Sequence, residues 1–121
     1  MAVILIVEDD VFIRELTEML IQAWGHQTLS ASDVEDALLL LRSPQHIDVL
    51  FTDICLKTAA SGGCELARQA IELRPQLGVL YTTGIFVSGE LQGQFVEGTR
   101  CLHKPYTPHQ LQHSFEALLA A

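Results

Sequence analysis

Residues 3–9 read VILIVED, and this stretch indicates the fold class. Five apolar residues in a row, most of them β-branched, are typical of a strand that is buried on both faces of a parallel sheet. The run ends in two acids, Glu8 and Asp9. Because ligands bind at the carboxyl edge of open α/β sheets, acids at the end of a buried strand predict a polar site there.

Strands of this kind alternate with helical segments along the chain. Apolar runs predict further strands at 27–31, 47–52, 77–82 and 99–103, and Phe12, Leu16 and Met19 show the helical spacing found between strands. The alternation predicts a doubly wound α/β fold, with a five-stranded parallel sheet and helices on both faces. A length of 121 residues fits a single domain, 1–121.

Capping residues mark the ends of several predicted helices. Gly25 follows the first helix as a stop signal. Ser32 and Glu35 have the spacing of a capping box before the second helix, and Thr107 and Gln110 have it before the last. These signals agree with the strand positions, so the sequence specifies the order of its elements consistently.

The composition excludes several functional classes. The formal net charge is -8, from 15 acidic and 7 basic residues, so we expect no direct binding to nucleic-acid phosphates. The N-terminal apolar run is too short for a secretory signal or a membrane span. Three cysteines without CxxC spacing are typical of reduced thiols, and we expect a cytoplasmic protein: Cys55, Cys64 and Cys101.

Polar residues end four of the predicted strands, and their charges predict a metal. Glu8, Asp9 and Asp53 against Lys104 leave a local charge of -2, which a divalent cation would neutralise. Two carboxylates about 4 Å apart repel by roughly 4 kcal/mol at an effective dielectric constant of 20. Oxygen ligands without clustered imidazoles or paired thiolates favour Mg²⁺.

The same residues can carry phosphoryl chemistry. A carboxylate beside Mg²⁺ and a lysine can attack a phosphoryl group and form an aspartyl phosphate. The metal and Lys104 would stabilise charge on the transferring oxygens, and the Thr83 hydroxyl would hydrogen-bond the product. Asp53 follows the third strand and is the predicted nucleophile.

Four segments resemble the signature motifs of response-regulator receiver domains, in order and with compatible spacing: ILIVEDD (4–10), VLFTDICL (49–56), VLYTTG (79–84) and CLHKPYTP (101–108). The resemblance implies a flavodoxin-like fold with strand order 2-1-3-4-5. It implies that Asp53 accepts the phosphoryl group and that Mg²⁺ is bound by Asp9, Asp53, the backbone carbonyl of Cys55 and, through water, Glu8. It also implies that Thr83 is the switch hydroxyl, that Lys104 binds the phosphate, and that the bond to Pro105 is cis.

The sequence departs from the family pattern in several places. The loop 57–63 is about two residues longer than usual, and Cys101 replaces an aromatic residue that couples to the switch threonine. Cys55 and Ile85 replace polar residues that position the hydrolytic water, so we expect slow self-dephosphorylation. Gly89 and Gly93 each lower the helix propensity of segment 87–96 by about 1 kcal/mol, and we hypothesise that phosphorylation reshapes this segment.

The resemblance implies a signalling domain rather than an enzyme. Its phosphodonor would be a sensor histidine kinase or a histidine phosphotransfer protein, and its output would pass through segment 87–96, the strand 99–103 and the last helix. The downstream target stays unidentified, and a homodimer is possible. The chain either acts alone or belongs to a larger kinase or regulator.

Other interpretations stay open at this stage. An aspartyl-phosphate phosphohydrolase would need a second acid two residues after the nucleophile, where Cys55 stands, and a covering cap. A receiver-fold module without phosphorylation would not need the full set of acids. Residues 8–10 also fit a helix cap, with Asp10 as N-cap. Three histidines have spacing that suits a transition metal but lack a fourth ligand, and an exposed helix face explains them more simply: His103, His109 and His113.

Overall fold

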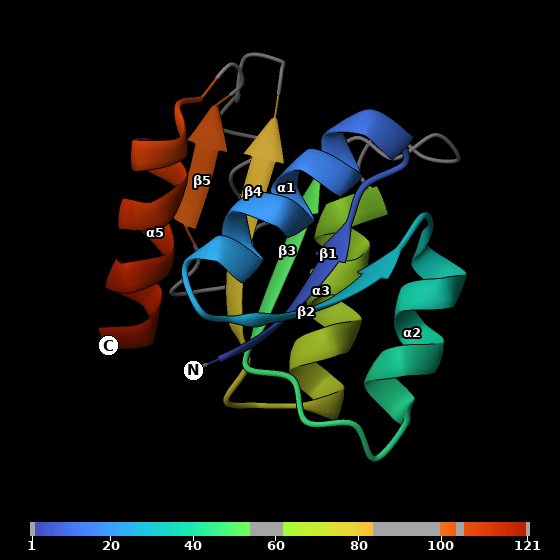
Figure 1. The fold of residues 1–121 in the computed structure, drawn as a ribbon. Helices are drawn as coiled ribbons and strands as arrows, with labels where there is room; N and C mark the ends of the chain where they lie inside the picture. Colours follow the sequence, from blue (N-terminus) through green and yellow to red (C-terminus); the bar gives the residue numbers. More distant parts are fainter. Residues whose placement is uncertain (1, 54–61, 84–99, 104–105, 121) are drawn as a thin grey trace.

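The computed structural model describes residues 2–53, 62–83, 100–103 and 106–120 (Figure 1). Its strands are β1 (Val3–Val7), β2 (Gln27–Ala31), β3 (Val49–Asp53), β4 (Gly78–Thr83) and β5 (Arg100–His103). Its helices are α1 (Val11–Ala23), α2 (Val34–Arg42), α3 (Gly62–Leu73) and α5 (Pro108–Ala120). The predicted segment 87–96 lies outside the described residues.

The strands form one parallel sheet in the order β2-β1-β3-β4-β5, which confirms the predicted fold and strand order. β1 and β3 lie at the centre, and all five residues of each are buried. That burial explains the apolar runs at residues 3–7 and 49–51, since a strand covered by helices on both faces has no solvent side. Three strands differ slightly from their predicted bounds: β3 starts at Val49, β4 covers Gly78–Thr83 and β5 starts at Arg100.

Two apolar clusters fill the two sides of the sheet. The first packs α2 and α3 against one face and contains Leu5, Leu50 and Tyr81. The second packs α1 and α5 against the other face and contains Ile6, Phe51, Leu80 and Phe115 among others. Successive strand residues point to opposite faces, so the alternation along each strand assigns its residues to one cluster or the other. We call the second side the α1/α5 face (Figure 1).

The helix ends confirm two of the predicted caps and correct one. Gly25 has a φ of 92°, a conformation that favours glycine after a helix. Before α5, Thr107 and Gln110 exchange the two hydrogen bonds of a capping box. The Ser32–Glu35 box is wrong, because the N-cap of α2 is Asp33, whose carboxylate accepts a bond of 2.8 Å from the Asp36 backbone.

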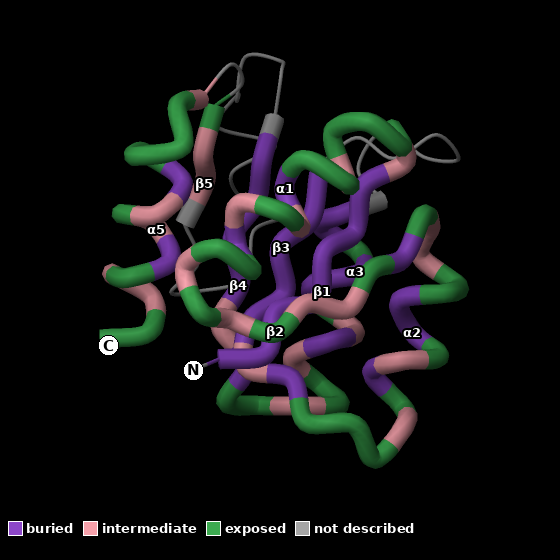
Figure 2. Tube along the Cα trace, viewed as in Figure 1, coloured by how far each residue is buried: buried purple, intermediate pink, exposed green. Residues whose placement is uncertain are grey.

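The orientation of α1 also differs from what its apolar spacing suggests. Thr17 and Ile21 face the sheet, while three large apolar residues of the predicted stripe are exposed: Phe12, Leu16 and Met19. Thr17 can be buried because its hydroxyl donates a bond of 2.7 Å to the backbone oxygen of Ile13. Figure 2 shows the outer side of α1 as exposed. Among the helices that the structure describes, none is long and apolar enough to span a membrane.

Candidate functional site

The carboxyl ends of β1, β3 and β4 bring the predicted polar residues to one edge of the sheet. Val7 pairs with Thr52, so Glu8 and Asp53 each lie one residue beyond a paired position on neighbouring strands. Asp53 in turn pairs with Thr82 of β4. Because side chains alternate along a strand, these three residues lie on the α1/α5 face, as Ile6, Phe51 and Leu80 do two residues earlier.

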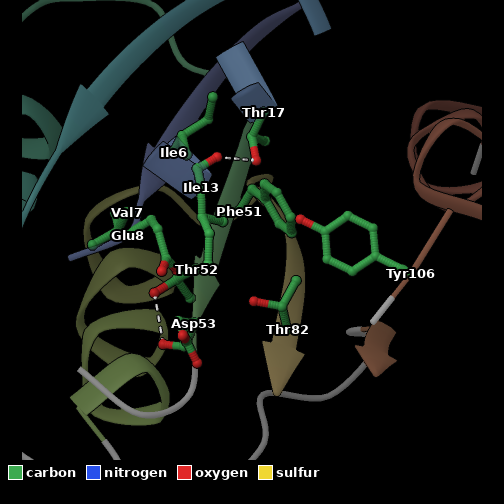
Figure 3. Close-up of a pocket in the computed structure, with 10 residues that line it drawn as sticks. All are labelled: Ile6, Val7, Glu8, Ile13, Thr17, Phe51, Thr52, Asp53, Thr82 and Tyr106. Atoms are coloured by element: carbon green, nitrogen blue, oxygen red, sulfur yellow. Dashed lines mark hydrogen bonds between the residues drawn. The ribbon is translucent and has the colours of Figure 1, made fainter. Parts of the chain in front are cut away.

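Below this edge lies a small hollow of about 10 Å³, lined by Ile6, Val7, Glu8, Ile13, Thr17, Phe51, Thr52, Asp53, Thr82 and Tyr106 (Figure 3). Its walls are partly apolar, but two of its lining residues are nearly buried acids. Glu8 is 6% exposed and Asp53 is 8% exposed. Two acids kept at this depth on neighbouring strand ends are candidates for a functional site.

The loop after β1 is held in place by its own hydrogen bonds. The Asp10 carboxylate accepts bonds from the backbone of Phe12 at 2.9 Å and Ile13 at 3.1 Å. A Glu8 carboxylate oxygen accepts from the Asp10 backbone at 3.4 Å, and Arg14 donates to the Glu8 backbone oxygen at 2.9 Å. Asp10 is therefore the N-cap of α1, while half-buried Asp9 stands between it and Glu8.

The donor groups at this edge suit a hard cation. Glu8, Asp9 and Asp53 offer carboxylate oxygens, which Mg²⁺ prefers. Among the residues that the structure describes, no group of three acidic, histidine or cysteine residues is placed to hold a metal ion. The predicted carbonyl ligand, Cys55, lies outside the described residues.

A comparison with models of known protein families identifies the family of this chain. The model of the response regulator receiver domain matches residues 4–116, almost the whole chain. The chain belongs to the response-regulator receiver family.

Solved receiver structures agree with this assignment. A response regulator receiver protein from Sinorhizobium medicae is 28% identical, with a TM-score of 0.90 over 99% of this chain and 95% of that one. A receiver domain from Clostridium thermocellum is 25% identical, with a TM-score of 0.83 over 99% and 95%. A Vibrio cholerae chemotaxis protein, 24% identical, shares the fold with a TM-score of 0.85 over 98% of each chain.

The structure places only part of the predicted receiver site. It brings Glu8 and Asp53 together on one hollow and sets Asp9 beside Glu8. The Thr83 backbone ends β4, where it pairs with His103. Four other predicted positions fall outside the described residues and stay predictions: Cys55, Ile85, Lys104 and Pro105.

Cys101 occupies the position where most receivers carry an aromatic residue. Its side chain is half-buried and packs against the α2/α3 cluster, on the other side of the sheet from Phe51 and Phe115. Burial raises the pKa of its thiol. Cys101 and Cys64 are both free thiols, as predicted, and a neutral, inert Cys101 acts as a small apolar residue.

The sequence places Thr82 at a polar strand end but assigns it no role, and it gives no sign of Tyr106. Thr82 is 2% exposed and shares the face of Asp53, a placement that follows from strand alternation once the register of β3 and β4 is known. Tyr106 reaches the hollow from the segment before α5, and no local pattern indicates this. The three histidines, by contrast, are exposed as expected: His103, His109 and His113.

Proposed function

We propose that this receiver domain accepts a phosphoryl group on Asp53 in a Mg²⁺-dependent reaction. The observation that carries the proposal is the pair of nearly buried acids, Glu8 and Asp53, on neighbouring central strands at the carboxyl edge. In a receiver, such a pair supplies a nucleophile and a metal-binding group within one site. The proposed domain is the full range 1–121, a signalling domain rather than an enzyme, in a cytoplasmic protein.

Each predicted residue has a role in the proposed reaction. Asp9, Asp53, the Cys55 carbonyl and, through water, Glu8 would hold Mg²⁺, which neutralises charge on the phosphoryl oxygens when bound. Lys104 would bind a phosphate oxygen, and the Thr83 hydroxyl would donate a hydrogen bond to the product. Asp10 has no part in the chemistry, because its carboxylate caps α1.

The reaction exchanges one bond to phosphorus for another. A carboxylate oxygen of Asp53 attacks the phosphorus of a phosphohistidine, the phosphorus–nitrogen bond breaks, and the imidazole leaves with its electron pair. The product is an acyl phosphate on Asp53. Cys55 and Ile85 offer little to position a hydrolytic water, so the product would have a long lifetime.

Mg²⁺ should stabilise the folded protein measurably. A ligand at 100 times its dissociation constant adds about 2.7 kcal/mol to the free energy of unfolding. We expect a gain of roughly 1–3 kcal/mol in urea denaturation between metal-free buffer and saturating Mg²⁺. Asp9→Asn should remove most of this gain, while Asp36→Asn, a change at an exposed acid on α2, should keep it. An equal gain in all three proteins would argue against the proposed metal site.

The exposed stripe on α1 supports a protein phosphodonor. Phe12 is 83%, Leu16 58% and Met19 66% exposed, and their spacing of four and three residues places them on one side of the helix. Contiguous exposed apolar side chains commonly mark an interaction surface. The stripe begins just after the Asp10 cap, beside the site that a donor histidine must reach. We assign it to the donor protein, a histidine kinase or phosphotransfer protein.

Removing an apolar contact from this stripe should slow transfer from a protein donor. Leu16→Ala should lower the rate from a purified histidine phosphotransfer protein by about tenfold, relative to the rate with acetyl phosphate, since a truncated interface anchor costs about 1–2 kcal/mol. Leu39→Ala is the matched control, because Leu39 is 66% exposed on α2. If the ratio of the protein-donor rate to the acetyl phosphate rate is the same in Leu16→Ala and Leu39→Ala, the stripe is not the docking surface. If the stripe instead binds a second copy of the chain, Leu16→Ala should lower the fraction of dimer measured by sedimentation.

A further inference from the structure

The hollow beneath Asp53 has room for about one water molecule. A volume of about 10 Å³ is near the lower limit for a bound water, which also needs two to four polar partners. The hollow is lined by two acids, Glu8 and Asp53, and by four hydroxyl residues, Thr17, Thr52, Thr82 and Tyr106. The hydroxyls of Thr17 and Thr52 already donate to backbone oxygens. Its polar groups and its size therefore both fit a single water.

Thr82 gives the most direct indication of such a water. The residue is 2% exposed, and its hydroxyl points into the hollow (Figure 3). Among the residues that the structure describes, none forms a hydrogen bond with this hydroxyl. Among these residues, every fully enclosed side-chain oxygen has a hydrogen-bond partner. Because the Thr82 hydroxyl has none among them, its oxygen is not fully enclosed, and it opens on the hollow. A hydroxyl at this depth normally has a partner, and a water in the hollow would supply it.

Tyr106 also lines the hollow, from the segment that precedes α5. Its ring packs against the α1/α5 cluster, and its hydroxyl points toward the hollow beside Phe51 (Figure 3). The residue directly precedes Thr107, the N-cap side chain of α5. A change in the position of Tyr106 would therefore act on the start of α5.

We propose that one water molecule in this hollow links the hydroxyls of Thr82 and Tyr106 to the carboxylates of Glu8 and Asp53, so that Tyr106 responds when Asp53 is phosphorylated. The inference rests on the proposed function. Phosphorylation turns the charged Asp53 carboxylate into an acyl phosphate, whose carbonyl oxygen is a weaker acceptor, so the water loses a strong partner. Tyr106 is then the aromatic residue that responds to phosphorylation, and it lies on the opposite face of the sheet from Cys101. Thr82 is a positioning residue that holds the water.

The two tyrosines of the chain allow a test with an internal reference. Tyr81 is fully buried in the α2/α3 cluster, and Tyr106 lies on the α1/α5 face. Side-chain ¹³C NMR of tyrosine-labelled protein is recorded with and without saturating beryllofluoride and Mg²⁺. We expect the Tyr106 ring signals to move more than those of Tyr81. Thr82→Val, which keeps the shape but removes the hydroxyl, should reduce the Tyr106 shift at least twofold, and Thr82→Ser should restore it.

The possible outcomes separate this inference from the proposed function. Beryllofluoride that binds at Asp53, seen by ¹⁹F NMR, with a Tyr106 shift of equal size in wild type and Thr82→Val would overturn the water link alone. Failure of beryllofluoride to bind wild type would overturn the proposed function and the link with it. Should Thr82→Val not fold, a crystal structure of the wild type decides. We expect density for a water within hydrogen-bond distance of both hydroxyls, and an empty hollow would reject the inference.

Discussion

Replacement of Asp53 by asparagine should abolish phosphorylation completely. Wild-type protein incubated with acetyl phosphate and Mg²⁺ should gain one phosphate per chain, and Asp53→Asn should gain none, because a carboxamide is a poor nucleophile while its size is nearly the same. Asp53 is the acid that ends β3 and opens on the hollow. Intact-protein mass spectrometry measures the gain, and hydroxylamine should remove it from the wild type.

Asp36→Asn provides the matched control for this experiment. Asp36 is an exposed acid on α2, and it should keep the full gain when changed. A phosphate that persists in Asp53→Asn would move the acceptor to another residue. A loss in both variants would mean that the assay reports general damage rather than the site.

Phe115→Ala should cost about 3–5 kcal/mol in the free energy of unfolding, the usual range for a buried phenylalanine. The Phe115 ring is 1% exposed and meets the Phe51 ring edge-on, with centroids 5.3 Å apart. Truncation removes this contact and leaves a cavity beside Phe51, one of the residues that line the hollow. Urea denaturation monitored by circular dichroism measures the loss.

Phe12→Ala is the corresponding control, since it makes the same chemical change on the exposed side of α1. Phe12 is 83% exposed, so its truncation should change stability by less than about 0.5 kcal/mol. Similar losses in the two variants would contradict the assignment of Phe115 to the core and of Phe12 to the surface. The pair therefore also tests the observed orientation of α1.

The fold was predictable because the central strands are apolar over most of their length. Residues 3–7 and 49–51 have no polar side chain, and such runs occur in parallel sheets covered on both sides. The caps at Gly25 and Thr107 were predictable for local reasons, since each depends only on neighbouring residues. The Asp33 cap was not, because Ser32 and Asp33 are both good N-cap residues and only the chain path selects one.

The side of α1 that packs against the sheet could not be predicted from the sequence of the helix. Apolar residues occur on both sides of this helix, so their period identifies a helix but not the side that meets the sheet. Thr17 can face the sheet because its hydroxyl donates a hydrogen bond to the Ile13 backbone oxygen of the same helix. Phe12 is left exposed, which is better explained by a partner than by the fold.

The acids of the site and the Thr83 hydroxyl were predicted, but the roles of Thr82 and Tyr106 could not be. Glu8, Asp9 and Asp53 follow apolar strands, and the topology brings strand ends together. The position of Thr82 depends on the register between β3 and β4, which the sequence of either strand alone does not specify. Tyr106 reaches the hollow only through the tertiary fold.

Peptide mapping after borohydride reduction can identify the residue on which the acyl phosphate forms, which we propose is Asp53. Borohydride converts an aspartyl phosphate to homoserine and so marks the residue that carried it. Trypsin cleavage at Arg42 and Lys57 releases the peptide 43–57, which contains Asp48 and Asp53. We expect homoserine at position 53 alone, and only after treatment with acetyl phosphate and Mg²⁺. Homoserine at Asp48 or Asp9, or none in fully folded protein, would contradict it.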